Sequence, residues 1–529
     1  MHAGDVRTDR IIALLLCFAV LFAAASGLDY DCPWYDDYAA YINDGIAIAD
    51  GHYEEQTRLN YFMHPSDMPD EANDGTLIYV WGYPLVLSLV YSAAGFDRTD
   101  YHSIIFYKLP SVLSLAAAAG ILYLLFRRRL SRASSALLSV YMCVHPIILD
   151  SAYSIYSDVF FMMLSAAAVF MAEKFICRLD EAKPGARCYI FGAVLGLLML
   201  ACYETRLNGI TVCALVLLMH ASHILHLRKA AANEAGQKPK VKIPAAAVMP
   251  YAVFAAAAVL CGSLLPRATA NTSDLLGIDP GQVLKNLEYY AELIYKYFAE
   301  IHTGTLPYAL RLAVGAASAL LICIGIINGR KRDVFFRVYM LFTALSFLTL
   351  ICLPYVQGHR YIFNILPFIL MALGYGIDSA YAWLKARFKG RAALDKAARA
   401  AVLLLTAAIL VSSVSGNLFR VLRGEDVRNE GVEEAYSRQS LEIYDYVKNE
   451  TPEDAVIAFV KPRVMYLNTG RAGFCPTANS KIHTLADADY YIVCGVLYNA
   501  GEQELINDNG AILEEQYSCD GYVIYKVID

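Results

Sequence analysis

Long apolar segments occur throughout the chain, and they limit what it can fold into more than any other feature. Two examples are LAAAAGILYLL (115–125) and AVLLLTAAILV (401–411), neither of which contains a charged residue. About 20 apolar residues are needed for a helix to cross the hydrocarbon core of a bilayer. The hydrophobic share of 57% is also high for a soluble protein. We therefore predict an α-helical polytopic membrane protein.

We predict about eleven membrane-spanning helices from the length of these segments. They are residues 10–27, 109–126, 133–149, 157–176, 188–204, 207–226, 244–265, 306–328, 335–354, 361–384 and 400–418. The first segment ends in AAASG, which also fits a signal-peptide cleavage site, but the spans that follow favour an uncleaved helix. The apolar segment 83–95 is too short to span, so we predict a helix lying in the membrane interface.

Basic residues are distributed unevenly between the connecting loops, and this predicts the orientation. The alternate loops 127–132, 174–187, 228–242, 330–337 and 385–399 hold 23 Lys and Arg residues, against 8 in the other loops between spans. Short loops rich in Lys and Arg prefer the cytoplasm. We expect a multi-pass protein of the plasma membrane with its N-terminus in the cytoplasm. Residues 28–108 and 266–305 would then form extracytoplasmic loops.

The composition changes near residue 420, where charged residues become frequent and hydrophobic patterns shorten. Residues 440–452 fit an amphipathic helix stopped by Pro452, and residues 454–460, 488–495 and 521–527 fit strands. We therefore predict a transmembrane domain over residues 1–419 and a small extracytoplasmic α/β domain over residues 420–529. The net charge of −6 gives no indication of nucleic-acid binding.

Two adjacent carboxylates open the first long loop. Asp36 and Asp37 lie among aromatic side chains in WYDDYAAY (34–41). On a helix, Asp37 would lie nearly opposite an apolar stripe and share a face with Tyr41, whereas Asp36 would border the stripe. Either both residues cap and solvate a helix start, or one of them faces a cavity.

More charged residues occur where predicted spans meet the extracytoplasmic side. Asp158 opens the fourth predicted span, where it could also be part of an N-terminal cap. The other residues are Glu204 and Arg206 before the sixth span, and His359, Arg360 and Tyr361 before the tenth. A cationic side chain at this depth could simply extend its charge to the polar membrane interface, or it could bind a phosphate. Carboxylates that activate a hydroxyl, with an arginine that binds a departing phosphate, would suit a reaction at the membrane surface.

In these motifs the chain resembles the GT-C superfamily of membrane glycosyltransferases. It is most similar to the branch with the protein O-mannosyltransferases and the lipid A aminoarabinose transferase. The resemblance rests on an ordered series over residues 10–420: Asp36-Asp37 followed by Tyr41 and IAIADG (46–51), WGYPLVLSLVYSAAG (81–95), Leu109-Pro110-Ser111, Asp158, and Arg360-Tyr361 followed by Pro367.

The resemblance implies an inverting transfer of a hexose or pentose from a polyprenyl-phosphate sugar to a hydroxyl of a protein, lipid or glycan. It implies Asp37 as the general base, with Asp36 as the alternative, and Asp158 as the second acid. Arg360 would contact the phosphate. The lysine that the aminoarabinose enzyme carries before its proline step is missing from TLIYVWGYP (76–84), so its role would pass to Arg58, His64 or Arg206. The full candidate set for substrate binding is Arg360, Tyr361, His359, Arg206, Glu204, Tyr41, His64 and Arg58.

Two other classes remain open from the sequence. A transporter or lipid flippase usually carries ionisable groups near the midplane, and the apolar segments here lack them. The other class is a protein that binds sugars or assembles partners but has no activity. Only an activity assay would distinguish it from an enzyme. No metal-binding motif stands out, and we expect no obligatory metal, although a divalent ion is compatible with the fold class.

Overall fold

The computed structural model describes most of the chain. The described residues are 3–30, 32–34, 36–63, 79–179, 185–235, 244–264, 279–299, 308–354, 356, 358–387, 393, 396–397, 400, 434–476, 483–495, 497, 505–507 and 512–528.

Eight described helices are long and apolar enough to cross a membrane, which confirms the polytopic helical class. They are α1 (Ala3–Ala25), α5 (Ile104–Arg127), α8 (Ser157–Leu179), α9 (Ala186–Thr205), α10 (Ile210–Ala235), α11 (Met249–Leu264), α13 (Tyr308–Arg332) and α14 (Val334–Ile351). The predicted third span is instead two helices, α6 (Arg132–Cys143) and α7 (Pro146–Tyr153), which meet at an angle of 47°. Proline cannot continue a helical hydrogen-bond ladder, and Pro146 starts the second of the two helices.

The predicted tenth span corresponds to α15 (Leu366–Arg387), which begins a few residues later than expected because residues 359–362 form a separate 3-10 turn. α15 packs against α13 through glycines: a Cβ on Gly325 would lie 1.8 Å from the carbonyl oxygen of Ala372. Small residues allow membrane helices to approach this closely. The predicted span 400–418 lies outside the described residues apart from residue 400, so the number of spans stays a prediction.

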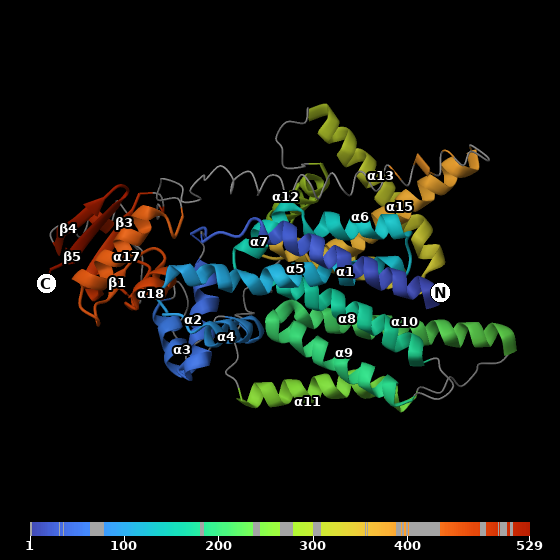
Figure 1. Cartoon of the computed structure of the whole chain (residues 1–529), viewed down its shortest axis with the longest axis horizontal. Coiled ribbons are helices and arrows are strands. Elements are labelled where there is room, and N and C mark those ends of the chain that lie inside the picture. Colours follow the sequence, from blue (N-terminus) through green and yellow to red (C-terminus); the bar gives the residue numbers. More distant parts are fainter. Residues whose placement is uncertain are drawn as a thin grey trace.

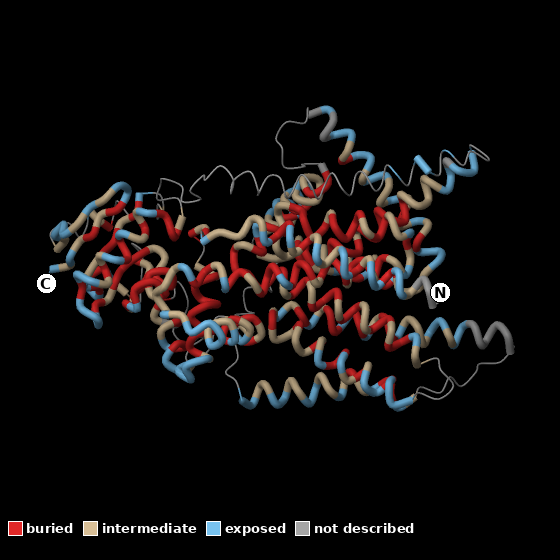
Figure 2. The backbone as a smooth tube through the Cα atoms, in the orientation of Figure 1, coloured by how far each residue is buried: buried red, intermediate tan, exposed pale blue. Residues whose placement is uncertain are grey.

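The pattern of burial in the bundle is the one expected for helices surrounded by lipid, with apolar side chains exposed on the outside. Buried residues occupy the centre of the bundle, while exposed residues follow its outer helices (Figure 2). Large apolar side chains such as Phe18, Val259 and Leu320 are 62–71% exposed on the outside of the bundle. A helix that is apolar on all faces is suited to this position, with protein on one side and lipid on the other.

Short helices lie between the bundle and the C-terminal sheet (Figure 1). They are α2 (Asp36–Asp50), α3 (Tyr53–Phe62), α4 (Gly82–Ala94) and the 3-10 helix η1 (Tyr101–Ser103). α4 is the short apolar helix predicted at 83–95, and it packs against α2. The remaining helical elements of the membrane part are η2 (Leu207–Gly209), η3 (Ala245–Val248), α12 (Pro280–Ala299) and η5 (His359–Ile362).

The C-terminal residues form a mixed five-stranded sheet with the order β2-β1-β3-β5-β4. Its elements are α17 (Arg438–Glu450), β1 (Ile457–Ala458), α18 (Pro462–Thr469), β2 (Gly473–Phe474), η6 (Leu485–Asp487), β3 (Tyr490–Cys494), β4 (Leu513–Cys519) and β5 (Tyr522–Val527). The predicted helix and the three predicted strands correspond to α17, β1, β3 and β5, whereas β2 and β4 were not predicted. Figure 1 shows this sheet at the end of the bundle opposite the N-terminus.

Candidate active site

The two adjacent aspartates at the start of α2 contact different parts of the chain. Asp37 Oδ2 lies 3.2 Å from Arg360 Nη2, so Asp37 faces the membrane bundle. Asp36 Oδ2 lies 2.9 Å from Arg463 Nη1, and Arg463 belongs to α18 in the C-terminal part. Consecutive helical residues point about 100° apart, which is why neighbours in the sequence meet different partners here.

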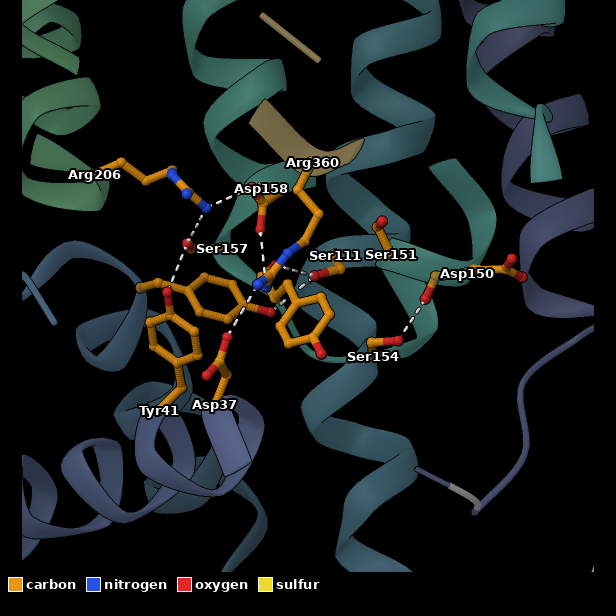
Figure 3. Close-up of polar contacts among 12 residues, drawn as sticks. Asp37, Tyr41, Ser111, Asp150, Ser151, Ser154, Ser157, Asp158, Arg206 and Arg360 are labelled. Atoms are coloured by element: carbon orange, nitrogen blue, oxygen red, sulfur yellow. Dashed lines mark hydrogen bonds and ion pairs between the residues drawn. The ribbon is translucent and has the colours of Figure 1, made fainter. Parts of the chain in front are cut away.

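Asp158, in the first turn of α8, brings both membrane arginines together (Figure 3). Its Oδ1 accepts a hydrogen bond from Arg206 Nη1. Its Oδ2 lies 3.7 Å from Arg360 Nη1, beyond hydrogen-bond distance, and is buried with no hydrogen-bond partner among the described residues. Arg360 thus lies between Asp37 and Asp158, and the four side chains form a compact group of two carboxylates and two guanidiniums.

Two unusual turns present these side chains. Ile155 has φ of 53° in the turn between α7 and α8, directly before Tyr156, Ser157 and Asp158. A β-branched residue in this left-handed region is strained by about 1–3 kcal/mol, and such strain is often found at functional sites. Gly358 has φ of 79° directly before η5, which carries Arg360, and glycine adopts that conformation without a Cβ clash.

Aromatic rings and hydroxyls fix the orientation of the two arginines. The Arg360 guanidinium lies 4.0 Å from the ring centre of Tyr156, and the Arg206 guanidinium lies 4.9 Å from that of Tyr361. Cations over aromatic faces at this distance are held by the ring quadrupole. Tyr41 Oη and Ser157 Oγ are 2.9 Å apart and form a hydrogen bond beside Arg206 (Figure 3).

Access to this group decreases with depth. The side chains of Asp37 and Arg360 are 33% and 24% exposed, against 14% for Arg206 and 3% for Asp158. A molecule that enters from the surface would therefore meet Asp37 and Arg360 first. Asp158 is almost fully buried, so it can hold and orient the arginines with little contact with bulk water.

Burial and neighbouring charges alter the acid–base properties around the site. Burial raises the pKa of the Asp36 carboxyl, although the nearby charge of Arg463 acts in the opposite direction. Burial, together with the charge of Arg360, lowers the pKa of His359 and favours a neutral imidazole.

The structure brings together some of the predicted residues and leaves others apart. Asp37, Tyr41, Asp158, Arg206, Arg360 and Tyr361 belong to one cluster, and His359 lies on the same 3-10 turn as Arg360. Glu204 lies in the last turn of α9, two residues before Arg206. Arg58 is exposed on α3 and forms no ion pair with the cluster among the described residues. His64 lies outside the described residues.

Some residues of the site were not predicted. Tyr156 and Ser157 precede Asp158 directly, so their proximity could have been inferred from the same motif. Arg463 is 427 residues from Asp36, and no local pattern marks it. The described residues contain no group of three His, Cys, Asp or Glu side chains that could hold a metal ion, and the metal requirement stays a prediction.

Comparisons with known proteins find a likeness in structure alone. No family model matches the sequence, and no curated protein matches it. The crystal structure of ArnT from Cupriavidus metallidurans bound to undecaprenyl phosphate is similar, with a TM-score of 0.57, 10% identity and coverage of 99% of this chain and 98% of that chain. The apo structure of the same protein gives a TM-score of 0.57 and 11% identity, covering 99% of this chain and 97% of that chain.

The archaeal oligosaccharyltransferase AglB from Archaeoglobus fulgidus, in complex with an inhibitory peptide and a dolichol-phosphate, is also similar. Its TM-score is 0.51 at 9% identity, with 91% of this chain and 69% of that chain covered. ArnT and AglB have the GT-C fold. The chain therefore has the same GT-C fold, and the resemblance noted in the sequence is confirmed at the level of the fold.

Proposed function

We propose that this integral membrane protein is a glycosyltransferase that moves one sugar from a polyprenyl-phosphate carrier to an acceptor hydroxyl. The acceptor would be a protein, a lipid or a glycan on the extracytoplasmic face of the plasma membrane. The observation that carries the proposal is the cluster of Asp37, Arg360, Asp158 and Arg206 at one end of the bundle. The fold supports it too, because the similar structures of ArnT and AglB contain undecaprenyl phosphate and dolichol-phosphate.

The distribution of basic residues supports a site on the extracytoplasmic side of the membrane, where the proposed acceptor would also lie. The cluster lies at the end of the bundle next to the C-terminal sheet, while the described helices α5, α8, α13 and α15 end in basic residues toward the other end. Basic loops prefer the cytoplasm, so the cluster and the sheet would be extracytoplasmic.

In this proposal Asp37 is the general base. It accepts the proton of the acceptor hydroxyl while the hydroxyl oxygen forms a bond to the anomeric carbon. The bond between that carbon and the phosphate oxygen breaks from the opposite side, so the configuration inverts and polyprenyl phosphate leaves. Its new negative charge would be stabilised by Arg360 and Arg206, which Asp158 and the two tyrosine rings hold in place.

The ion pair between Asp37 and Arg360 suggests how donor and base would be coupled. Arg360 Nη2 lies 3.2 Å from Asp37 Oδ2, so the guanidinium occupies the carboxylate in this structure. A phosphate that binds Arg360 would compete with Asp37 for the guanidinium. Donor binding would therefore release the Asp37 carboxylate from Arg360, so that it can accept the proton of the acceptor hydroxyl.

The position of the charged groups favours an enzyme over a transporter. In the eight described spans, Asp, Glu, Lys and Arg side chains lie in the first or last third of each helix. Transporters that couple substrate movement to ions usually place such groups near the midplane. A flippase would move the donor across vesicles without releasing free polyprenyl phosphate, whereas the transferase releases it with each turnover.

The direct test is transfer from labelled polyprenyl-phosphate sugars in membranes that contain the endogenous acceptors, using a panel of donor sugars. Asp37→Asn should reduce transfer by about 10²–10⁴-fold, the usual contribution of a general base. Asp36→Asn should cost less, and Glu55→Gln, an exposed acid on α3, is the control that should keep native activity. Native transfer by Asp37→Asn, with Asp36→Asn equally harmless, would refute the assignment.

A further inference from the structure

A groove lies between α10 and α14, near the end of the bundle away from the candidate active site. It has a volume of about 330 Å³ and is lined by Ser222, Leu225, His226, Lys229, Val334, Arg337, Val338 and Leu341. Each helix contributes four residues with the spacing i, i+3, i+4 and i+7, which places them on one face of that helix. The two faces meet because α10 and α14 pack against each other.

The groove has a polar part and an apolar part. Lys229 on α10 and Arg337 on α14 contribute two cations from opposite walls, and both side chains are exposed. His226 adds a ring nitrogen beside them. Further along both helices toward their middle lie Leu225 and Leu341, which are 62% and 50% exposed.

The two cations of the groove have no acidic partner among the described side chains. Among the described side chains, neither Lys229 nor Arg337 forms an ion pair. The carboxylate nearest in the sequence, Asp333, is bonded to Arg129 and to the amide of Phe335. Two cations that face each other across a concave surface, without an acid between them, repel each other and favour an anion in the space.

We propose that this groove binds one anionic phospholipid, with its phosphate between Lys229 and Arg337 and its acyl chains along Leu225, Val338 and Leu341. Basic pockets between membrane helices are suited to anionic headgroups, and the apolar lining continues toward the hydrocarbon core. A free phosphate would gain the charges but leave the exposed leucines without a partner. The inference does not rest on the proposed transfer reaction, since the groove is remote from the cluster around Asp158.

The test uses the full chain, purified in detergent, stripped of lipid and mixed with phosphatidylglycerol or phosphatidylcholine of the same acyl chains. Bound lipids are counted by native mass spectrometry. The wild type should retain phosphatidylglycerol at least about tenfold better than phosphatidylcholine. The double variant Lys229→Gln/Arg337→Gln should bind phosphatidylglycerol about 30-fold more weakly, given the usual contribution of each basic side chain near anionic lipid.

The matched control is Arg187→Gln/Arg387→Gln, which removes two exposed cations from the same end of the bundle but outside the groove. It should retain phosphatidylglycerol like the wild type. An equal loss in both double variants would overturn the proposal, because the attraction would then come from the general positive charge of this end.

Three further results would also overturn it. Equal binding of the two phospholipids by the wild type would mean that the groove recognises only acyl chains. Release of phosphatidylglycerol by millimolar inorganic phosphate would indicate a site for a free anion. A change of oligomeric state in the Lys229→Gln/Arg337→Gln variant, with lipid retention unchanged, would make a second copy of the chain the occupant.

Discussion

Replacing Arg463 by methionine should weaken the attachment of α18 to α2, and the size of the effect can be worked out from the ion pair. Arg463 and Asp36 are 2.9 Å apart, with side chains 8% and 19% exposed. Removing one partner of a buried pair typically costs about 3–5 kcal/mol, because the other charge is left without compensation. The upper limit is set by protonation: neutralising a carboxyl of ordinary pKa 3.8 at pH 7 costs about 4 kcal/mol. Burial already raises the pKa of Asp36, so we expect a loss of about 3 kcal/mol.

The loss should depend on pH with a defined sign. A carboxyl whose pKa is raised in the folded state binds its proton more tightly when folded. Stability therefore falls as the pH rises from the unfolded value of 3.8 through the folded pKa. Without Arg463 the folded pKa of Asp36 rises further, which widens that window. The deficit of Arg463→Met relative to the wild type should be small near pH 4 and should grow between pH 5 and pH 8.

The assay is pulse proteolysis of the detergent-solubilised protein across a urea series at pH 5, 6, 7 and 8. It follows release of the predicted C-terminal domain, residues 420–529. The double variant Asp36→Asn/Arg463→Met should recover most of the loss, since no buried charge remains. Lys461→Met removes a nearby cation that acts on Asp36 only through space, and should cost less than about 1 kcal/mol. A double variant as unstable as Arg463→Met, or a deficit that is the same at every pH, would show that packing and not charge holds the contact.

Three other changes test separate parts of the structure. Arg360→Lys keeps the charge but loses the guanidinium that reaches both Asp37 and Asp158, and should raise the donor KM about tenfold in the transfer assay; an unchanged KM contradicts a phosphate role. Burial raises the pKa of Asp44 to about 7, so the stability should fall by up to about 4 kcal/mol as the pH rises from 4 to 8. Asp44→Asn should abolish this pH dependence in urea titrations. If the pH dependence persists, it comes from another group. Glu173→Gln should lower stability by about 3–5 kcal/mol, because the buried carboxylate lies 2.6 Å from a guanidinium nitrogen of Arg129, and an unchanged thermal midpoint would show that the contact contributes nothing.

The parts of the fold that could be predicted are those set by local composition. The long apolar segments predict the spans because backbone groups in lipid must be satisfied within a helix. The start of α2 could be predicted because aspartate favours the first turn of a helix, as Asp36 and Asp37 show. The break between α6 and α7 was missed because apolar content alone cannot distinguish one span from two bent helices.

The four charged residues of the cluster were predicted, but their pairing and the partner of Asp36 were not. Asp158 and Arg360 were expected at one depth because both stand at the ends of predicted spans, and the structure brings them within 3.7 Å. The pairing of Asp36 with Arg463 depends on how the C-terminal sheet is seated, and no local pattern carries that information.

The contact between Asp36 and Arg463 also bears on the biosynthesis of the protein. The two residues are 427 positions apart, and translation proceeds at about 5–20 residues per second, so roughly 20–85 seconds separate their emergence from the ribosome. Throughout that interval α2 carries its two carboxylates without the guanidinium that later fixes Asp36. The β-bridge between Pro33 and Glu434 closes over the same interval. The nascent chain thus cannot fix Asp36 through Arg463 until the 427 residues that separate them have been made, so α2 depends on its local packing alone for that part of synthesis.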